Sequence, residues 1–492
     1  MAPIASAEMV TPPRDLLGGF TVPGNPSAIA DWLRSRDWEA IDAVIVSLDM
    51  LVYGGLVASR VHQVEEGKAL ERLRVIEEIR EAHPELPVYG FNIIMRLAPT
   101  ADGTNDAWRG ALERWAELAP QAETDAAAAE ELTRLEARIP DGVLADYRSA
   151  RTRNLAINRA AVGLVENGTI DRLILGQDDA KPQGVHVADR EALLEKIDAG
   201  GTGDRVAVQP GADELGMLLL ARVLSDRSGY TPSIRVVYSS EAGRKGVAPY
   251  EDRPLHETVS LQIAAAGGRE TADESAELLF HVFASRQEEG AGKAFAERIA
   301  REVRDGRRVI VADIDTRGNI QGGSEEFTEA LLETGVFPSL FGYASWNTAG
   351  NTIGTALPQG LLYFLSVRKG AREAHDSLGV PGTRNQAQFT FLLHRLINDY
   401  AYHGLVRPDI NRVYAREQGV NPMRLDPLQT RHFEKTILSR VKPQAARFLD
   451  QFQLPVRLTE LTLTLPWGRT FEAEIGVVVS ELHETESRVR QP

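Results

Sequence analysis

Two adjacent aspartates, Asp178 and Asp179, directly follow an apolar run and precede a loop with Pro and Gly, in the segment LILGQDDAKPQG. If both carboxylates face one pocket, the repulsion between their charges raises the pKa of one of them. Glycoside cleavage uses such a protonated carboxylic acid beside an ionised partner. The pair therefore predicts a catalytic acid at Asp179 and an ionised partner at Asp178. The structural alternative is that one Asp caps the following turn and the other is solvated.

Polar residues also follow most of the other apolar runs that we interpret as strands. In parallel α/β folds, ligands bind outside the carboxyl ends of the strands. We therefore expect these residues to converge on one site, although Asp and Asn also serve there as helix caps and turn formers. The predicted substrate-binding residues are Asp49, Arg60, Asn92, Arg96, Lys181, Asp213, Glu214, Tyr238, Asp313, Asp315, Trp346, Asn347 and Asn351.

Several of these side chains suit particular ligands. Arg60 and Arg96 can each bind a carboxylate or phosphate through two hydrogen bonds, but both are also typical surface salt-bridge residues. The amides of Asn347 and Asn351 can donate to and accept from hydroxyl or acetamido groups. The neighbouring Trp346 offers a stacking face to a sugar ring, unless this Gly-rich stretch is only a turn with a packed indole.

A metal site is the second interpretation of the acidic residues. Asp178, Asp179, Asp213, Glu214 or Asp313 could supply the oxygen ligands that Mg²⁺ or Ca²⁺ prefers. No transition metal is expected, because the chain has no cysteine and its ten histidines lack ligand spacing. In the favoured interpretation the protein uses no cofactor.

Short β-rich runs, separated by helical patterns, precede these residues along the chain. The predicted strands are 43–48, 88–94, 172–176, 205–209, 234–238, 278–283, 307–312 and 339–343. Their nearly continuous apolar cores, such as AVIVSL and RVIVAD, are typical of strands that are covered on both faces. The alternation of strand and helix predicts parallel βα units.

We therefore predict an α/β fold with a mainly parallel sheet. Residues 1–360 would form a (β/α)-barrel-like core with a helical insertion at about 105–165, and residues 361–492 a helical and β-hairpin C-terminal part. The alternative is two doubly wound domains that meet near residues 267–275, with the site between them.

The composition narrows the class of protein. The chain has 492 residues and a formal net charge of −15, which disfavours binding to phosphate backbones, so we expect no nucleic-acid partner. It has no cysteine, its N-terminus lacks a signal-peptide pattern, and no run reaches roughly 18 apolar residues. We expect a cytoplasmic protein with no membrane partner that acts on a small molecule or carbohydrate.

Several of these motifs, taken together, resemble a bacterial family, DUF 4127. The matching stretches cover about residues 10–480 and are SLDMLVYGGLVASR, FNIIMRLAPTADG, LILGQDDAKPQGVH, QPGADELGMLLLAR, VADIDTRGN, GYASWNTAGNTIGTAL and LPWGRTFE. The resemblance groups the motifs without implying a reaction. Members of that family begin with a further strand that ends in a Leu-Asp-Asp-Arg-Pro-like motif. This chain starts after that point, at TPPRDLLGGF, so either its start codon is wrongly assigned or the protein lacks that first strand. A carboxylate supplied by that strand would be missing from the site.

The Asp178–Asp179 pair alone is similar to the catalytic pair of the O-GlcNAcase-type hexosaminidases. That similarity implies that Asp178 orients a 2-acetamido group and that Asp179 protonates the leaving oxygen. The favoured hypothesis is therefore a glycoside hydrolase, with N-acetylated amino sugars as its narrower substrate class. The alternatives are a divalent-metal-dependent enzyme on phosphorylated or carboxylated small molecules and a non-catalytic sugar-binding protein.

Overall fold

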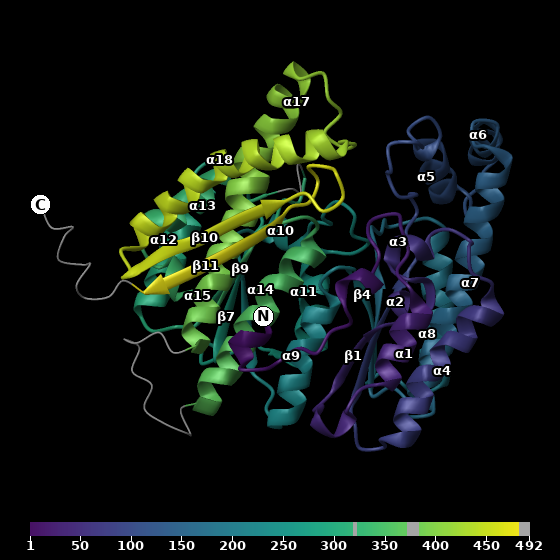
Figure 1. The fold of residues 1–492 in the computed structure, drawn as a ribbon, viewed down its shortest axis with the longest axis horizontal. Coiled ribbons are helices and arrows are strands. Elements are labelled where there is room, and N and C mark those ends of the chain that lie inside the picture. The colour runs from purple at the N-terminus through teal and green to yellow at the C-terminus, as the bar shows by residue number, and fades with distance from the viewer. Residues whose placement is uncertain (318–321, 371–382, 482–492) are drawn as a thin grey trace, which may run out of the picture. The chain divides into compact units, whose positions relative to one another are not determined.

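The computed structural model describes residues 1–317, 322–370 and 383–481, and the chain folds into two compact units (Figure 1). The N-terminal unit comprises Val10–Leu219 and Tyr250–Arg253. The C-terminal unit comprises Met1–Met9, Leu220–Pro249 and the chain from Pro254 onward. The chain passes from one unit to the other within helix α9 (Leu215–Ser228).

The N-terminal unit contains a sheet of four parallel strands in the order β1-β2-β3-β4. The strands are β1 (Val44–Ser47), β2 (Val88–Ile94), β3 (Arg172–Gln177) and β4 (Val206–Pro210). Each lies within one or two residues of a predicted strand. Because all four run in one direction, their carboxyl ends meet at one edge of the sheet, which gathers the residues that follow them.

All helices of this unit except the first lie between its strands in the sequence, and the helices form two packed groups. They are α1 (Pro26–Arg34), α2 (Leu48–Tyr53), α3 (Leu56–Ser59), α4 (Glu66–Ala82), α5 (Arg109–Leu118), α6 (Ala126–Glu136), α7 (Asp141–Glu166) and α8 (Val185–Ala199), with short 3-10 turns at Arg14–Leu16 and Trp38–Ala40. One hydrophobic cluster joins the sheet to α4, α7 and α8 through Val88, Leu173, Val206, Ile76, Ile157 and Leu193. A second cluster joins α5, α6 and the first half of α7 to Met95 and Leu97, which follow β2.

The predicted helical insertion at 105–165 is therefore only partly an insertion. Its last helix, α7, has 26 residues and also serves as the crossover from β2 to β3, since its C-terminal half packs on the sheet. The extra structure is α5 and α6, which lie against the segment that leads away from β2.

The C-terminal unit contains a second parallel sheet, of five strands in the order β6-β5-β7-β8-β9. The strands are β5 (Ser233–Tyr238), β6 (Arg269–Glu270), β7 (Leu278–Phe283), β8 (Val309–Asp313) and β9 (Gly342–Ala344). Numbered within the unit, the order is 2-1-3-4-5, which is a doubly wound arrangement with its switch point between β5 and β7.

Helices and a hairpin complete this unit. They are α10 (Glu241–Lys245), α11 (Leu255–Ala265), α12 (Ala291–Arg304), α13 (Glu325–Glu333), α14 (Ala349–Gly370), α15 (Thr383–Arg395), two π-helices (Leu396–Val406 and Ile410–Tyr414), α16 (Arg407–Asp409), α17 (Ala415–Glu417), α18 (Pro427–Phe452), 3-10 turns at Ala2–Ala5 and Phe337–Ser339, and the antiparallel pair β10 (Val456–Thr464) and β11 (Glu474–Glu481). Val237 and Val311 of the sheet share one core with Phe448 of α18, Leu463 of β10 and Ile475 of β11.

The α/β class and the mainly parallel sheets confirm the predicted fold class. The structure joins the parallel strands that it describes in two separate sheets and does not confirm one barrel. Residue 360, the predicted end of the core, lies inside α14, and the C-terminal helices and hairpin share the core of the second sheet. Residues 267–275 lie within the C-terminal unit and contain its edge strand β6.

Candidate functional site

The carboxyl edge of the N-terminal sheet gathers three aspartates and two arginines. Asp49 follows β1 as the second residue of α2, and Asp178 and Asp179 directly follow β3. Arg96 lies two residues after β2, and Arg60 follows the short helix α3. We call these five residues the carboxylate centre. They follow three neighbouring strands, and the structure brings them together.

Asp178 is the more enclosed aspartate of the pair. Its Oδ2 lies 2.5 Å from Nη2 of Arg60, and both side chains are 8% exposed. Arg60 also donates to the hydroxyl of Thr100 at 2.6 Å, and Nη1 of Arg96 lies 4.0 Å from Oδ1 of Asp178. A buried carboxylate needs such a partner, and Arg60 supplies it.

Asp179 has a different environment although it is the next residue. Its side chain is 28% exposed and pairs with Arg96. Burial and the neighbouring charge of Asp178 raise the pKa of Asp179, while Arg96 and Arg60 oppose that rise. Its φ of +42° lies in the left-handed region, where an Asp is tolerated but uncommon, and such conformations gather at functional sites.

Asp49 is the least exposed member of the carboxylate centre, at 2%. The pKa of Asp49 is raised to about 7, mainly by burial and further by the charge of Asp178. A backbone hydrogen bond with Ile93 and the charge of Arg60 oppose this rise. Its Oδ2 makes no hydrogen bond to any described residue. Asp49, predicted only as a binding residue, is therefore a second group that can hold a proton near neutral pH.

The raised pKa of Asp49 predicts a pH-dependent stability. The folded state binds a proton that the unfolded chain releases near pH 4, so the contribution of Asp49 is complete below about pH 4 and is lost as the pH rises to about 7. Asp49→Asn keeps the shape and removes this titration. Urea unfolding should show the wild type losing up to about 4 kcal/mol relative to Asp49→Asn over that range. A difference that stays constant with pH would contradict the assignment, and Asp198→Asn, on the exposed end of α8, is the matched control.

Three other predicted residues of the N-terminal unit have partners outside the carboxylate centre. Asn92 is 1% exposed and donates to Oδ1 of Asn158 on α7 at 2.8 Å. Lys181 pairs with Glu113 and Glu117 of α5, at 3.0 and 3.3 Å. Glu214 is fully buried after β4, where burial raises its pKa to about 8, and its Oε2 accepts from the N–H of Ala212. Asp213 precedes it in the same turn.

The remaining predicted residues belong to the C-terminal unit. Asp313, at the end of β8, is fully paired: Oδ1 accepts from Arg286 at 2.8 Å and Oδ2 from the N–H of Ser324 at 2.6 Å. Asp315 accepts from Gln287. Tyr238 ends β5, and Asn347, with a φ of +56°, follows β9 and precedes Asn351 in α14. Each unit thus has its own group of strand-end residues, and their convergence on one cavity stays a prediction.

Trp346 is held in a way that limits its use as a stacking face. Its indole N–H donates to Thr355 at 3.0 Å, and the guanidinium of Arg395 lies over the ring, 5.7 Å from its centroid. The expected sugar contact would have to displace this guanidinium or use the opposite face of the ring.

The structure places one further acidic residue, Asp399, near Asp313, and no sequence pattern predicts its role. Asp399 is completely buried and accepts from the N–H of Ser345 at 2.9 Å, just after β9. It lies on the first π-helix, with Arg395 3.4 Å away one turn earlier. Such π-helices are frequent at functional sites. Hydrophobic periodicity does not predict them, because a π-helix departs from the 3.6-residue repeat of an α-helix.

No helix among the described residues is long and apolar enough to span a membrane. In the same parts of the chain, no three His, Asp or Glu side chains are grouped so that they could hold a metal ion. Two acidic residues of the carboxylate centre, Asp178 and Asp179, are instead paired with Arg60 and Arg96.

The fold and the site define a class: an α/β protein of two parallel-sheet units, with a buried carboxylate–guanidinium cluster at the carboxyl edge of its first sheet. Within that class, the chain matches the family described as "Protein of unknown function (DUF4127)" over residues 1–476, and it belongs to that family. No curated protein and no solved structure matches the chain.

Proposed function

We propose that the protein is a glycoside hydrolase in which Asp179 is the general acid and Asp178 its ionised partner, with N-acetylated amino sugars as substrates. One observation carries the proposal: two adjacent carboxyls have unequal environments. Asp178 is buried against Arg60, whereas the more exposed Asp179 has a raised pKa. Acid–base cleavage needs one protonated and one ionised carboxyl at the same place.

The chemistry would run in two steps. Asp179 donates its proton to the glycosidic oxygen while the acetamido carbonyl oxygen of the substrate attacks the anomeric carbon, so that the C–O bond to the leaving group breaks. Asp178 accepts a hydrogen bond from the acetamido N–H and orients that group. Asp179, now ionised, then takes a proton from water, which opens the cyclic intermediate and gives the free sugar.

Two features of the site bear on how it would select a substrate. Arg60 and Arg96 are engaged with the aspartates, which leaves the centre without an excess of positive charge. The segment after β2 supplies Thr100 as a partner of Arg60, and α5 packs against that segment. We therefore place substrate selectivity in the 97–118 region.

The absence of cysteine fits a reducing compartment, and we propose a cytoplasmic location.

The test of the proposal is turnover by the purified full chain on a panel of aryl and natural glycosides. We expect release of reducing sugar from N-acetylglucosaminides and N-acetylgalactosaminides, and little from the matching glucosides and galactosides, which lack the acetamido group. Hydrolysis that is independent of that group would contradict the substrate-assisted mechanism. No turnover of any glycoside, together with tight sugar binding, would favour the non-catalytic alternative.

Chelation separates this proposal from a divalent-metal-dependent enzyme. After dialysis against EDTA, activity on the best glycoside should stay within about twofold of the untreated protein, because protonation by Asp179 needs no metal. Loss of activity that Mg²⁺ or Ca²⁺ restores would favour the metal-dependent alternative on phosphorylated or carboxylated substrates.

A further inference from the structure

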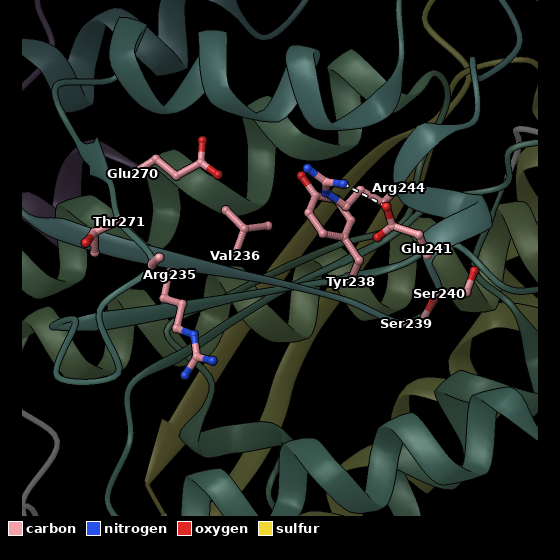
Figure 2. A pocket seen from close by; sticks show the side chains of 10 residues that line it. Arg235, Val236, Tyr238, Ser239, Ser240, Glu241, Arg244, Glu270 and Thr271 are labelled. Carbon is pink, nitrogen blue, oxygen red and sulfur yellow. Dashed lines mark hydrogen bonds and ion pairs between the residues drawn. The ribbon is translucent and has the colours of Figure 1, made fainter.

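An open pocket of about 790 Å³ lies in the C-terminal unit, at the carboxyl end of β5 and beside the short edge strand β6. Its lining includes Val236, Tyr238, Ser240, Arg244 and Glu270. Figure 2 shows Val236, Tyr238 and Glu270 extending to the same side of the sheet, while Arg235 points to the opposite side. The volume falls in the range of about 300–1,000 Å³ that is usual for small-molecule sites.

The pocket lies where the two strands that flank β5 differ in length. β6 pairs with β5 only at Ser233 and Ile234, whereas β7 pairs with β5 as far as Tyr238. Ile234 directs its C=O toward β6, where it accepts from the N–H of Thr271. Alternate residues of a strand direct their backbone groups to the same side, so Val236 and Tyr238 present theirs to the open edge.

The topology of the sheet favours a ligand here. In open α/β sheets, ligands bind outside the carboxyl ends of the strands, where the strand order reverses. That reversal lies between β5 and β7, and the loop after β5 borders both it and the pocket. Ser239 Oγ lies 2.7 Å from Ser285 Oγ and accepts from the N–H of Ala284, so this loop is fixed to the one after β7.

The lining has balanced charges. Arg244 pairs with Glu241 at 2.9 Å, and Glu270 accepts from the hydroxyl of Ser260 at 2.5 Å. The pocket therefore has no excess of positive charge for a phosphate. The hydroxyl oxygen of Tyr238 is buried and makes no hydrogen bond to a described residue. Its aromatic ring and the methyl groups of Val236 supply apolar contact beside that hydroxyl.

We propose that this pocket is a binding site for a neutral polyhydroxylated ring, such as a monosaccharide. The ring would pack on Tyr238 and Val236, and its hydroxyls would donate to Glu270 and exchange a hydrogen bond with the Tyr238 hydroxyl. Sugar sites combine an aromatic surface with such planar and hydroxyl polar groups. All of these residues belong to the C-terminal unit, and the proposal does not depend on the chemistry of the carboxylate centre.

The test is calorimetric titration of the full chain with N-acetylglucosamine, glucose, inorganic phosphate and AMP as probes. We expect millimolar or tighter binding of a sugar, weakened roughly 3- to 10-fold by Tyr238→Phe, which removes one hydrogen bond, and by Glu270→Gln. Glu297→Gln, on an exposed residue of α12 outside the lining, is the matched control and should bind as the wild type does.

Asp178→Asn is included because it separates the two sites. Sugar binding that Asp178→Asn preserves and Tyr238→Phe weakens supports the pocket even if the protein hydrolyses no glycoside. Binding that Asp178→Asn abolishes and Tyr238→Phe leaves unchanged would assign the sugar to the carboxylate centre and overturn the proposal. Absence of sugar binding, or binding of phosphate or AMP that Tyr238→Phe weakens, would also overturn it.

Discussion

Asp179→Asn is expected to lower kcat roughly 10²- to 10⁴-fold on glycosides with poor leaving groups, because that is the usual contribution of general acid catalysis. On activated aryl glycosides, whose leaving groups need little protonation, the loss should be within about tenfold. The raised pKa of Asp179 is the structural reason, since it lets the side chain hold a proton where an ordinary Asp is ionised.

The experiment compares how the rate of hydrolysis depends on the leaving group in the wild type, in Asp179→Asn and in a control variant. Rates for a series of aryl N-acetylglucosaminides would be measured with the wild type, Asp179→Asn and Asp198→Asn, the last an exposed control on α8. A steep dependence of rate on leaving-group pKa in Asp179→Asn alone is the expected result. Equal losses of rate on every substrate would mean that Asp179 has a structural role and is not the general acid.

Asp178→Asn is expected to reduce turnover on activated and natural glycosides alike, by at least roughly 10²-fold. Its proposed part is to orient the acetamido nucleophile, which every substrate needs whatever its leaving group, and small errors of orientation cost that much. The measurement is kcat on the same substrate series, with thermal unfolding as a check on the fold.

A second variant tests whether that loss of activity comes from destabilisation of the fold. Asp178→Asn leaves Arg60 without its carboxylate partner, and a buried unpaired charge destabilises a protein. Arg60→Met in the Asp178→Asn background removes that charge as well. Restored stability without restored activity is expected, whereas recovery of activity together with stability would show that Asp178 acts only through the fold.

The strands and the strand-end positions of the polar residues could be predicted from the sequence, for identifiable reasons. The apolar runs before Asp49, Asp178 and Asp313 are those of strands covered on both faces, and the structure places strands at all three. Parallel direction then brings the residues after β1, β2 and β3 to one edge. That argument is enough to group Asp49, Arg96, Asp178 and Asp179.

Sequence patterns do not predict which of these residues contact one another. Arg60 and Asp178 are 118 residues apart, and no local period links a guanidinium after one short helix to a carboxylate after β3. The same holds for Asn92, whose strand-end position suggests a ligand but whose side chain bonds to Asn158 on α7. The proton-holding character of Asp49 depends on its burial, which only the packing of the unit determines.

The division of the strands into two sheets also has no readable signal in the sequence. Consecutive βα units look alike whether they continue one sheet or begin another, because each strand has the same apolar core. The chain leaves the first sheet through α9, an apolar helix like any crossover helix. β6 has only two residues, too few for a recognisable strand pattern, and its shortness is what opens the pocket beside β5.

Hydrolysis in water enriched in ¹⁸O tests whether Asp178 and Asp179 cleave the bond at the anomeric carbon. The wild type and the Asp178→Asn/Asp179→Asn double variant would each be incubated with a natural N-acetylglucosaminide, and the products analysed by mass spectrometry. Cleavage at the anomeric carbon by the carboxylate centre predicts ¹⁸O in the released sugar with the wild type and none above background with the double variant. Equal incorporation by both proteins, or label in the leaving alcohol instead of the sugar, would rule out Asp178 and Asp179 as the catalytic pair of a glycoside hydrolase.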